Sequence, residues 1–498
     1  MPRMRRLWIL PLMGVVVFAG CLGPSANTKN ATPVRAARLP QPEMSVQATI
    51  QNQPAGSQAP EVRIQVTIKN AGAAPLPVQP SDFTLLSVEG DSYTQSGAPS
   101  SAQPLSTTLK PGATGTGTLT FLAPATSLTH GCLLYRSPHS PVMTCASLGG
   151  GSTQESVRSS QLPTDLHEYR LSGGLGMPWD TTLDSSGNIW FTEPGCDFAP
   201  VCAPDAPPGE IGKMNARTHT VRFFRLPAIH GNQPMFLTFD TRGHLWFTTP
   251  DNSMIGEFDP QGWNLEGQWR VIPDSGPWDL AFVQGQVWYT ENFISGIGVF
   301  NPVTHAFHDY VTPSPNSHPY GLSTDPTSNG HLWFTENSNS AERIGLLDTA
   351  TGKITEYPIR ATLKEGLTPH LITVDAQGHP WWSEGTARAI GTLDPAAAVP
   401  GQCVTTSGDC SGVIEYLLPP TPPGCVHSHV SGITAWGRMI WFDDSLSAQV
   451  GSFDPQNLSF RLYNLAVCNT HPHDGLLVDA SGHVWWNEQY LNLIGELS

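Results

Sequence analysis

The sequence has little charge and no long apolar run. Only 13% of its 498 residues are charged, about half the share usual in globular domains, so long helices covered with charged side chains are not expected. No apolar stretch approaches the length that a membrane-spanning helix requires, so such a helix is excluded. A phosphate-binding glycine loop, a dinucleotide fingerprint and a Gly-x-Ser-x-Gly nucleophile motif are also missing, so these classes of enzyme are excluded.

Basic residues are scarce as well. Asp and Glu number 41 against 25 Lys and Arg, which gives a net charge of -16, and such a field repels phosphate backbones. Nucleic acid is therefore not an expected partner. The chain is rich in Gly (48), Pro (46) and Trp (15), and 39% of it is hydrophobic. Many turns around a large apolar core predict an all-β fold.

Residues 1–20 are predicted to be a lipoprotein signal peptide. Arg3, Arg5 and Arg6 precede an apolar run, residues 7–20, that ends Phe-Ala-Gly before Cys21, and this run is too short to span a bilayer. The ending resembles a bacterial lipobox, in which the cysteine is acylated. We expect an exported protein held at the extracytoplasmic face of the cell membrane only by lipid on Cys21, with residues 21–42 as a linker; an ordinary secretory signal is the alternative.

The eight remaining cysteines suit an oxidising compartment. Their number is even and no two show the Cys-x-x-Cys spacing of many metal sites, so disulfides are expected. Proximity along the chain predicts the pairs Cys132–Cys145, Cys196–Cys202, Cys403–Cys410 and Cys425–Cys468.

Residues 43–150 show short segments with strand periodicity. Residues 62–68 (VRIQVTI) alternate between apolar and polar side chains, and residues 82–86 and 116–121 add similar segments. These patterns predict a β-sandwich. The runs NAGAAPLPV and TLKPGATGTGTLTF resemble the telokin-like, immunoglobulin-like accessory domain of bacterial lipoproteins. A Ser-rich linker follows at residues 151–162.

The rest of the chain, residues 163–498, is repetitive. A Trp-aromatic pair recurs about every 49 residues, the period of a four-stranded propeller blade. The seven copies are at Trp190, Trp246, Trp288, Trp333, Trp381, Trp441 and Trp485. The last copy lacks a fourth strand, whereas residues 167–171 form an isolated strand before the first copy. We predict a seven-bladed β-propeller in which this strand completes the last blade.

An acidic residue follows most of these tryptophans by three places, as in the motif WFTE. Since it recurs in six of the seven copies, we interpret it as part of the architecture that bonds to the backbone of a neighbouring blade.

Departures from the repeat point to a site. In most blades a proline opens the innermost strand, and the residues beside it should meet at one mouth of the central channel. The apolar side of this mouth is predicted to include Trp179 and Trp278, and the other side is predicted to include His318, His370, His427, His429, His471 and His473. Aromatic rings opposite groups that bind protons or metal suit a ligand site. The alternative is that these are ordinary surface-loop histidines.

The repeat GxPxxIxxDxxGxxWFTExxxxxIGxxDPxTxxxxEYPLP resembles that of virginiamycin B lyase and its streptogramin lyase-like relatives. That family opens a cyclic depsipeptide by elimination, with Mg²⁺ and a general base. The resemblance implies that His473 is the catalytic base, that Glu488 lies near the second metal ligand although one place closer to the Trp, and that His471 replaces the first metal Glu. It also makes His429 the nearest candidate for the substrate-binding histidine.

Two kinds of metal are compatible with these positions. The family implies Mg²⁺, while His471 in place of a carboxylate favours Zn²⁺ or Mn²⁺. The prediction is thus a monomeric lyase that opens a cyclic or ester-containing compound with a divalent metal. A non-catalytic propeller that binds a small molecule, a cyclic peptide or a protein, and a metal-dependent hydrolase of the lactonase type, are the alternatives.

Overall fold

The computed structural model describes residues 43–49, 61–70, 75–86, 92–94, 105–122, 132–135, 144–147, 166–171, 174–195, 207–338, 342–359, 368–385, 387–401, 403, 410–419, 421, 428–465 and 470–498. The described part is all-β, apart from the short 3-10 turns η1 (Pro80–Asp82) and η3 (Pro250–Asn252). It contains no helix long and apolar enough to cross a membrane.

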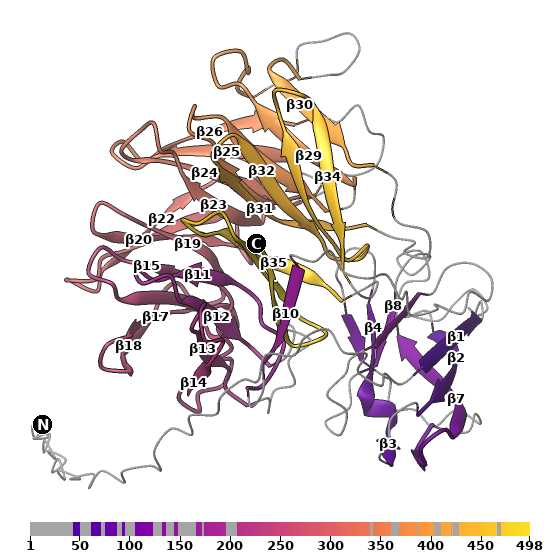
Figure 1. Ribbon diagram of the computed structural model, residues 1–498. Helices are drawn as coiled ribbons and strands as arrows, with labels where there is room; N and C mark the ends of the chain where they lie inside the picture. Colours follow the sequence, from indigo (N-terminus) through magenta and orange to yellow (C-terminus); the bar gives the residue numbers. More distant parts are fainter. Residues whose placement is uncertain are drawn as a thin grey trace, which may run out of the picture.

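The N-terminal region forms small antiparallel sheets (Figure 1). One has the order β1 (Glu43–Thr49), β2 (Glu61–Lys69), β7 (Thr114–Leu122), and another has the order β5 (Ser92–Thr94), β4 (Phe83–Leu86), β8 (Cys132–Tyr135), β9 (Thr144–Ser147). A third pairs β3 (Leu76–Val78) with β6 (Thr107–Leu109). The apolar residues of the alternating segment in β2, Val62 to Ile68, are buried in one core with Phe83, Phe121 and Tyr135. The immunoglobulin-like identity of this region stays a prediction.

Seven four-stranded antiparallel sheets form the propeller. Blades 1 and 2 consist of β11 (Thr181–Leu183), β12 (Ile189–Glu193), β13 (Glu210–Met214), β14 (Val221–Arg225), and of β15 (Leu237–Phe239), β16 (Leu245–Thr249), β17 (Met254–Asp259), β18 (Asn264–Arg270). Blades 3 and 4 consist of β19 (Pro277–Val283), β20 (Gln286–Glu291), β21 (Gly296–Phe300), β22 (Phe307–Val311), and of β23 (Pro319–Thr324), β24 (His331–Glu336), β25 (Arg343–Asp348), β26 (Lys353–Pro358). Blades 5 and 6 consist of β27 (Pro369–Val374), β28 (Pro380–Glu384), β29 (Ala389–Leu393), β30 (Val413–Leu417), and of β31 (Val430–Trp436), β32 (Met439–Asp444), β33 (Gln449–Asp454), β34 (Ser459–Asn464).

Blade 7 joins the two ends of the propeller sequence. Its strands are β35 (Pro472–Val478), β36 (Val484–Glu488), β37 (Leu493–Leu497) and β10 (Leu166–Arg170). β10 pairs antiparallel with β37, and Tyr169 Oη donates a 2.7 Å hydrogen bond to Glu496. Figure 1 shows β10 beside the yellow C-terminal strands. The ring therefore closes without leaving an unpaired edge on β37.

The repeated sequence motif has a local physical cause. In four blades the aspartate of the Asp-x-x-Gly turn accepts a hydrogen bond of 3.0–3.2 Å from the indole Nε1 of the tryptophan six residues later. These turns contain glycines with φ between +76° and +89°, a region that favours glycine. On the next strand the glycine of each Ile-Gly or Val-Gly pair lies beneath the aromatic residue that follows the tryptophan, where a Cβ atom would overlap the ring. The motif is therefore packing chemistry.

A belt of side-chain hydrogen bonds joins neighbouring blades. In blades 1 to 5 the hydroxyl of the residue two places after the Trp donates to a carbonyl oxygen of the next blade at 2.5–2.7 Å. In blade 7 Asn487 donates likewise to Trp179 of blade 1. These bonds fix the innermost strands, and hence the side chains at the mouth of the channel, relative to one another.

The acidic residue three places after the Trp has a different partner from the one expected. Glu336 faces Glu356, Glu291 faces Asp309 and Glu384 faces Glu415, each on the fourth strand of its own blade. Burial first, and then the second carboxyl, raises the pKa of Glu336 to about 9 and of Glu291 to about 8. The prediction of a bond to a neighbouring blade's backbone is therefore wrong for these three residues, since they form buried carboxyl pairs within a blade.

The predicted disulfide Cys403–Cys410 is present. Cys196, Cys202, Cys425 and Cys468 lie outside the described residues, as do the side chains of Cys132 and Cys145. Cys21 lies outside them too.

Candidate functional site

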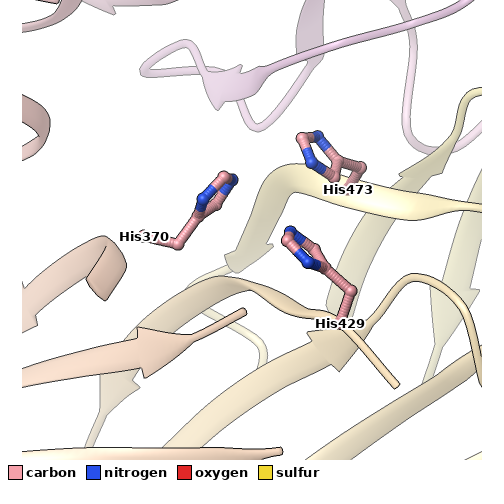
Figure 2. Close-up of side chains that lie close together, drawn as sticks. All are labelled: His370, His429 and His473. Carbon is pink, nitrogen blue, oxygen red and sulfur yellow. The ribbon is translucent and has the colours of Figure 1, made fainter. Parts of the chain in front are cut away.

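Three histidines meet where blades 5, 6 and 7 begin. His370 is the second residue of β27, His429 immediately precedes β31, and His473 is the second residue of β35. Their ring centroids are 5.1 Å (His370 to His429), 5.3 Å (His370 to His473) and 5.9 Å (His429 to His473) apart. Figure 2 shows the three side chains converging from separate elements. Each is only 7–8% exposed, so this is a nearly closed polar site.

Asp474 is the charged centre of the site. Its Oδ1 lies 3.2 Å from His370 Nε2, and its Oδ2 lies 3.2 Å from His473 Nδ1 and accepts a 2.9 Å hydrogen bond from Tyr320 Oη. Burial alone would raise the pKa of Asp474, but the facing His473 and His370 outweigh it and hold the pKa well below its usual value. Asp474 is therefore an ionised, fully buried carboxylate shared by two imidazoles.

A β-bulge puts Asp474 in this position. In blades 3 to 6 the first strand contains one residue more than the second strand between two paired positions. In blade 5, for example, Pro369 and Ile372 are three positions apart, but their partners on the second strand are two positions apart. In blade 7 the corresponding residues, Pro472 and Leu476, are four positions apart, while their partners are again two positions apart. The extra residue lies where Asp474 adopts φ +57°, in the left-handed region. Bulges of this kind redirect side chains next to active sites.

The pKa values of His370 and His429 are lower than that of a free imidazole. Burial first, offset in part by Asp474, lowers the pKa of His370. Burial, and then the proximity of His370 and His473, lowers the pKa of His429 far below its usual value. Both rings are therefore neutral at pH 7, and each keeps one nitrogen lone pair. Gly385 lies against the His429 ring, where any Cβ atom would overlap it.

The predicted aromatic side of the mouth adjoins the histidines. Trp179 meets the His473 ring edge-on at 5.2 Å and Trp278 at 6.2 Å, while Trp278 also packs on Tyr320 at 5.2 Å. Both tryptophans are at most 2% exposed. Both rings are therefore buried and pack against residues of the site, rather than lining an open pocket.

Two predicted histidines are not placed in this cluster. His318 is exposed, and its Nδ1 lies 2.8 Å from the carbonyl oxygen of Asn292. His427 lies outside the described residues.

His471 lies beside the cluster with a partner of its own. Its Nδ1 is 2.7 Å from Gln489 Oε1, and its ring stacks on Tyr490 at 4.3 Å and on His473 at 4.7 Å. Burial, and then the neighbouring His473, lowers the pKa of His471 well below its usual value. The imidazole is therefore neutral and donates its Nδ1 proton to the amide oxygen.

Glu488 faces the closing strand. Its Oε1 accepts a 3.1 Å hydrogen bond from Trp486 Nε1, and its other main neighbour is Glu168 on β10. Burial, and then Glu168, raises the pKa of Glu488 well above its usual value. It is the blade-7 member of the carboxyl pairs described above.

These two residues do not fit the Mg²⁺ that the family implies. Mg²⁺ takes oxygen ligands and is usually held by carboxylates, whereas His471 offers a ring nitrogen and contacts Gln489, and Glu488 faces Trp486 and Glu168. The residue one place further from Trp485 is Gln489, which is neutral. The three-histidine cluster is the better candidate for a divalent metal, since its possible ligand nitrogens all lie within 4.8 Å of one another, and imidazole suits metals such as Zn²⁺.

Sequence reasoning did not identify Asp474, Tyr320 or Gln489. A signal for Asp474 exists: two residues separate the opening proline from the next Leu in PMFL, PWDL and PYGL, whereas three separate them in PHDGL of blade 7. Tyr320 follows an opening proline, as Trp179 and Trp278 do, but its bond to Asp474 crosses from blade 4 to blade 7 and has no sequence signal. Gln489 contacts His471 and His473 within blade 7, also without a signal.

Comparison with known proteins agrees with this fold. Residues 282–498 match the sequence model of the Virginiamycin B lyase family, and residues 34–138 match that of a domain of unknown function, DUF4352. No curated protein matches the chain. A streptogramin B lyase structure is similar at 24% identity and TM-score 0.53, and covers 67% of this chain and 97% of its own.

A second similar structure is a catalytically inactive histidine-to-alanine variant of virginiamycin B lyase from Staphylococcus aureus, with quinupristin. It has 24% identity and a TM-score of 0.52, and covers 66% of this chain and 98% of its own. At these identities the similarity shows the propeller fold.

Proposed function

We propose, from the match of residues 282–498 to the virginiamycin B lyase family, that this propeller opens a cyclic, ester-containing compound by β-elimination. The observation that carries the proposal is the His473–Asp474 pair, placed by the bulge of β35 at the histidine-lined mouth. A buried imidazole held by a carboxylate is a suitable general base.

We base the tautomer proposed for His473 on its contacts. Two groups compete for Nδ1: Asp474 Oδ2 at 3.2 Å, which would accept a proton, and Gln489 Nε2 at 3.4 Å, which would donate one. The contact with the ionised carboxylate is shorter and charge-assisted, so it prevails. Nδ1 then carries the proton, and Nε2 keeps the lone pair that accepts a proton from the substrate.

The elimination follows from this arrangement. His473 Nε2 removes the proton on the carbon next to a carbonyl, a C=C bond forms, and the C–O bond of the ester at the β-carbon breaks, so a carboxylate leaves and the ring opens. The carbonyl oxygen gains negative charge in this step, and the N–H of neutral His429 can stabilise it. No step requires Mg²⁺, which the residues present do not fit.

Quinupristin, the ligand named with the related lyase, is the first substrate to test. The full chain is incubated with it, and the product is analysed by mass spectrometry with fragmentation. Elimination gives a linear product of unchanged mass, whereas hydrolysis adds one water and would indicate the lactonase-type alternative. We expect His473→Ala to reduce turnover at least about 100-fold while calorimetry still detects binding, and the exposed-site control His318→Ala to behave as the wild type.

A second candidate is a non-catalytic propeller that binds a small molecule, a cyclic peptide or a protein. It is favoured by the neutral His471–Gln489 pair at the positions where the family resemblance places metal carboxylates. Binding of quinupristin without any product, in wild type and His473→Ala alike, would support this candidate over the lyase.

We also propose export and lipid attachment through Cys21, supported by the arginines and the short apolar run before it. Metabolic labelling with a radioactive fatty acid tests this directly. Label should enter the full-length protein, and Cys21→Ala should lose it.

A further inference from the structure

We infer that His370, His429 and His473 form a binding site for one transition-metal ion of the Zn²⁺ class. The inference goes beyond the elimination proposed above and does not depend on it: it describes a metal-loaded state, in which His473 Nε2 binds the ion and cannot at the same time act as the general base. It rests on the placement of three imidazoles, their nearest polar neighbours and the donor preferences of metals.

The spacing of the three rings suits a single ion. Each ligand of a tetrahedral zinc lies about 2.0–2.1 Å from the ion, so neighbouring ligand nitrogens are roughly 3.3 Å apart. The candidate nitrogens here already lie within 4.8 Å of one another. Small rotations of the three side chains would close this gap, because each extends from the start of a different blade toward a common space (Figure 2).

Two buried atoms at this site suit a cation. His370 Nε2 and Asp474 Oδ1 are 3.2 Å apart, yet neither makes a hydrogen bond of acceptable geometry. Buried polar atoms are almost always satisfied. A cation that contacts His370 Nε2 and lies close to the Asp474 carboxylate would satisfy both atoms.

The second layer of contacts is also that of a metal site. Metal-binding histidines usually donate their other ring N–H to a carboxylate or carbonyl. His473 Nδ1 contacts the Asp474 carboxylate, so its other nitrogen, Nε2, is left for the ion. His370 Nδ1 lies 3.1 Å from the side-chain amide of Asn337. If this amide is flipped, its oxygen accepts the Nδ1 proton, and Nε2 is left for the ion. The negative charge of Asp474 would also offset part of the charge of the ion.

A second cluster of potential ligands, Asp240, His244 and Glu257 in blade 2, serves as the contrast. There Arg242 Nη2 lies 2.7 Å from Asp240 Oδ2 and 2.7 Å from Glu257 Oε1. A guanidinium already occupies the place of a cation, so this cluster is not expected to bind metal. It provides a matched control.

The test is calorimetric titration of the metal-free full chain with Zn²⁺. We expect one ion per chain in the wild type and at least about 100-fold weaker binding in His370→Gln, His429→Gln and His473→Gln, since losing even a residue that orients a ligand costs roughly 10- to 100-fold. His244→Gln should bind as the wild type. No binding by the wild type, or loss of binding in His244→Gln alone, would overturn the inference.

A measurement on the wild-type protein tests the proposed site even if the variants fail to fold. With ¹⁵N-labelled histidine, one equivalent of Zn²⁺ should move the ring nitrogen resonances of three imidazoles, and Co²⁺ in its place should give the intense visible bands of a tetrahedral site. Shifts spread evenly over the exposed histidines would contradict the proposed site. Neither measurement uses a substrate, so failure to bind metal and failure to catalyse elimination are separate results.

Discussion

Replacement of Glu336 by Gln should stabilise the protein at neutral pH and reduce the dependence of its stability on pH. Glu336 is fully buried in blade 4 and faces Glu356. Its pKa rises from 4.5 to about 9, chiefly through burial. Folding therefore requires this carboxyl to take up a proton at pH 7, whereas the unfolded chain leaves it ionised.

The magnitude follows from linkage. A folded-state pKa above the unfolded value gives stability that is complete below the unfolded pKa of 4.5 and declines as pH rises toward 9, by about 1.4 kcal/mol per pH unit. At pH 7 the loss is at most about 3 kcal/mol. A glutamine at this position has no proton to take up and keeps an N–H that can donate to Glu356.

The assay is urea unfolding followed by tryptophan fluorescence at pH 5 and pH 8. This signal reports on the propeller, because all 15 tryptophans except Trp8 lie within residues 163–498. The free energy of unfolding of the wild type should fall by roughly 4 kcal/mol more than that of Glu336→Gln between these pH values. Glu266→Gln, at an exposed position, is the control. An identical fall in wild type and Glu336→Gln would refute the interpretation that the repeated acid forms protonated structural pairs.

Three further predictions concern the site and the ring closure. The double variant His471→Glu/Gln489→Glu should gain Mg²⁺ binding by calorimetry, because it replaces a neutral hydrogen-bonded pair with two carboxylates; no gain would mean that these side chains do not face a common ion. Asp474→Asn should lower kcat on an identified substrate roughly 100-fold with little change in KM, and an unchanged kcat would remove Asp474 from the proposed mechanism. Tyr169→Phe should lower the stability of the propeller by about 1 kcal/mol or more in urea unfolding, because it leaves the buried Glu496 with one donor fewer, whereas an unchanged stability would show that this bond does not contribute to closure.

The architecture could be predicted from the amino-acid sequence. A Trp-aromatic pair repeated at the spacing of a blade, an Ile-Gly or Val-Gly pair after it, and a single strand displaced to the start of the repeats were enough to predict seven blades. These signals are readable because they arise from contacts within one blade, such as Asp479 with Trp485 or Gly495 beneath Trp486. Contacts of this kind have fixed sequence separations, so they recur as a pattern.

The sequence also predicted that histidines of the last blades lie close together, which the structure shows for three of them. It placed His370, His429 and His473 at one mouth, since each stands beside the start of an innermost strand. It could not say which of the mouth histidines meet, because that depends on how far each blade turns its first residues toward the channel axis.

The chemistry of the site depends on tertiary contacts that the sequence does not reveal. The extra residue of β35 brings Asp474 between His370 and His473, and Tyr320 reaches the same carboxylate from blade 4 across 154 positions of sequence. The same folding pairs Glu488 with Glu168, from the opposite end of the propeller sequence, and raises the pKa of Glu488. Charge state, tautomer and ligand geometry depend on burial and on neighbours from other blades, and these quantities have no fixed spacing along a chain.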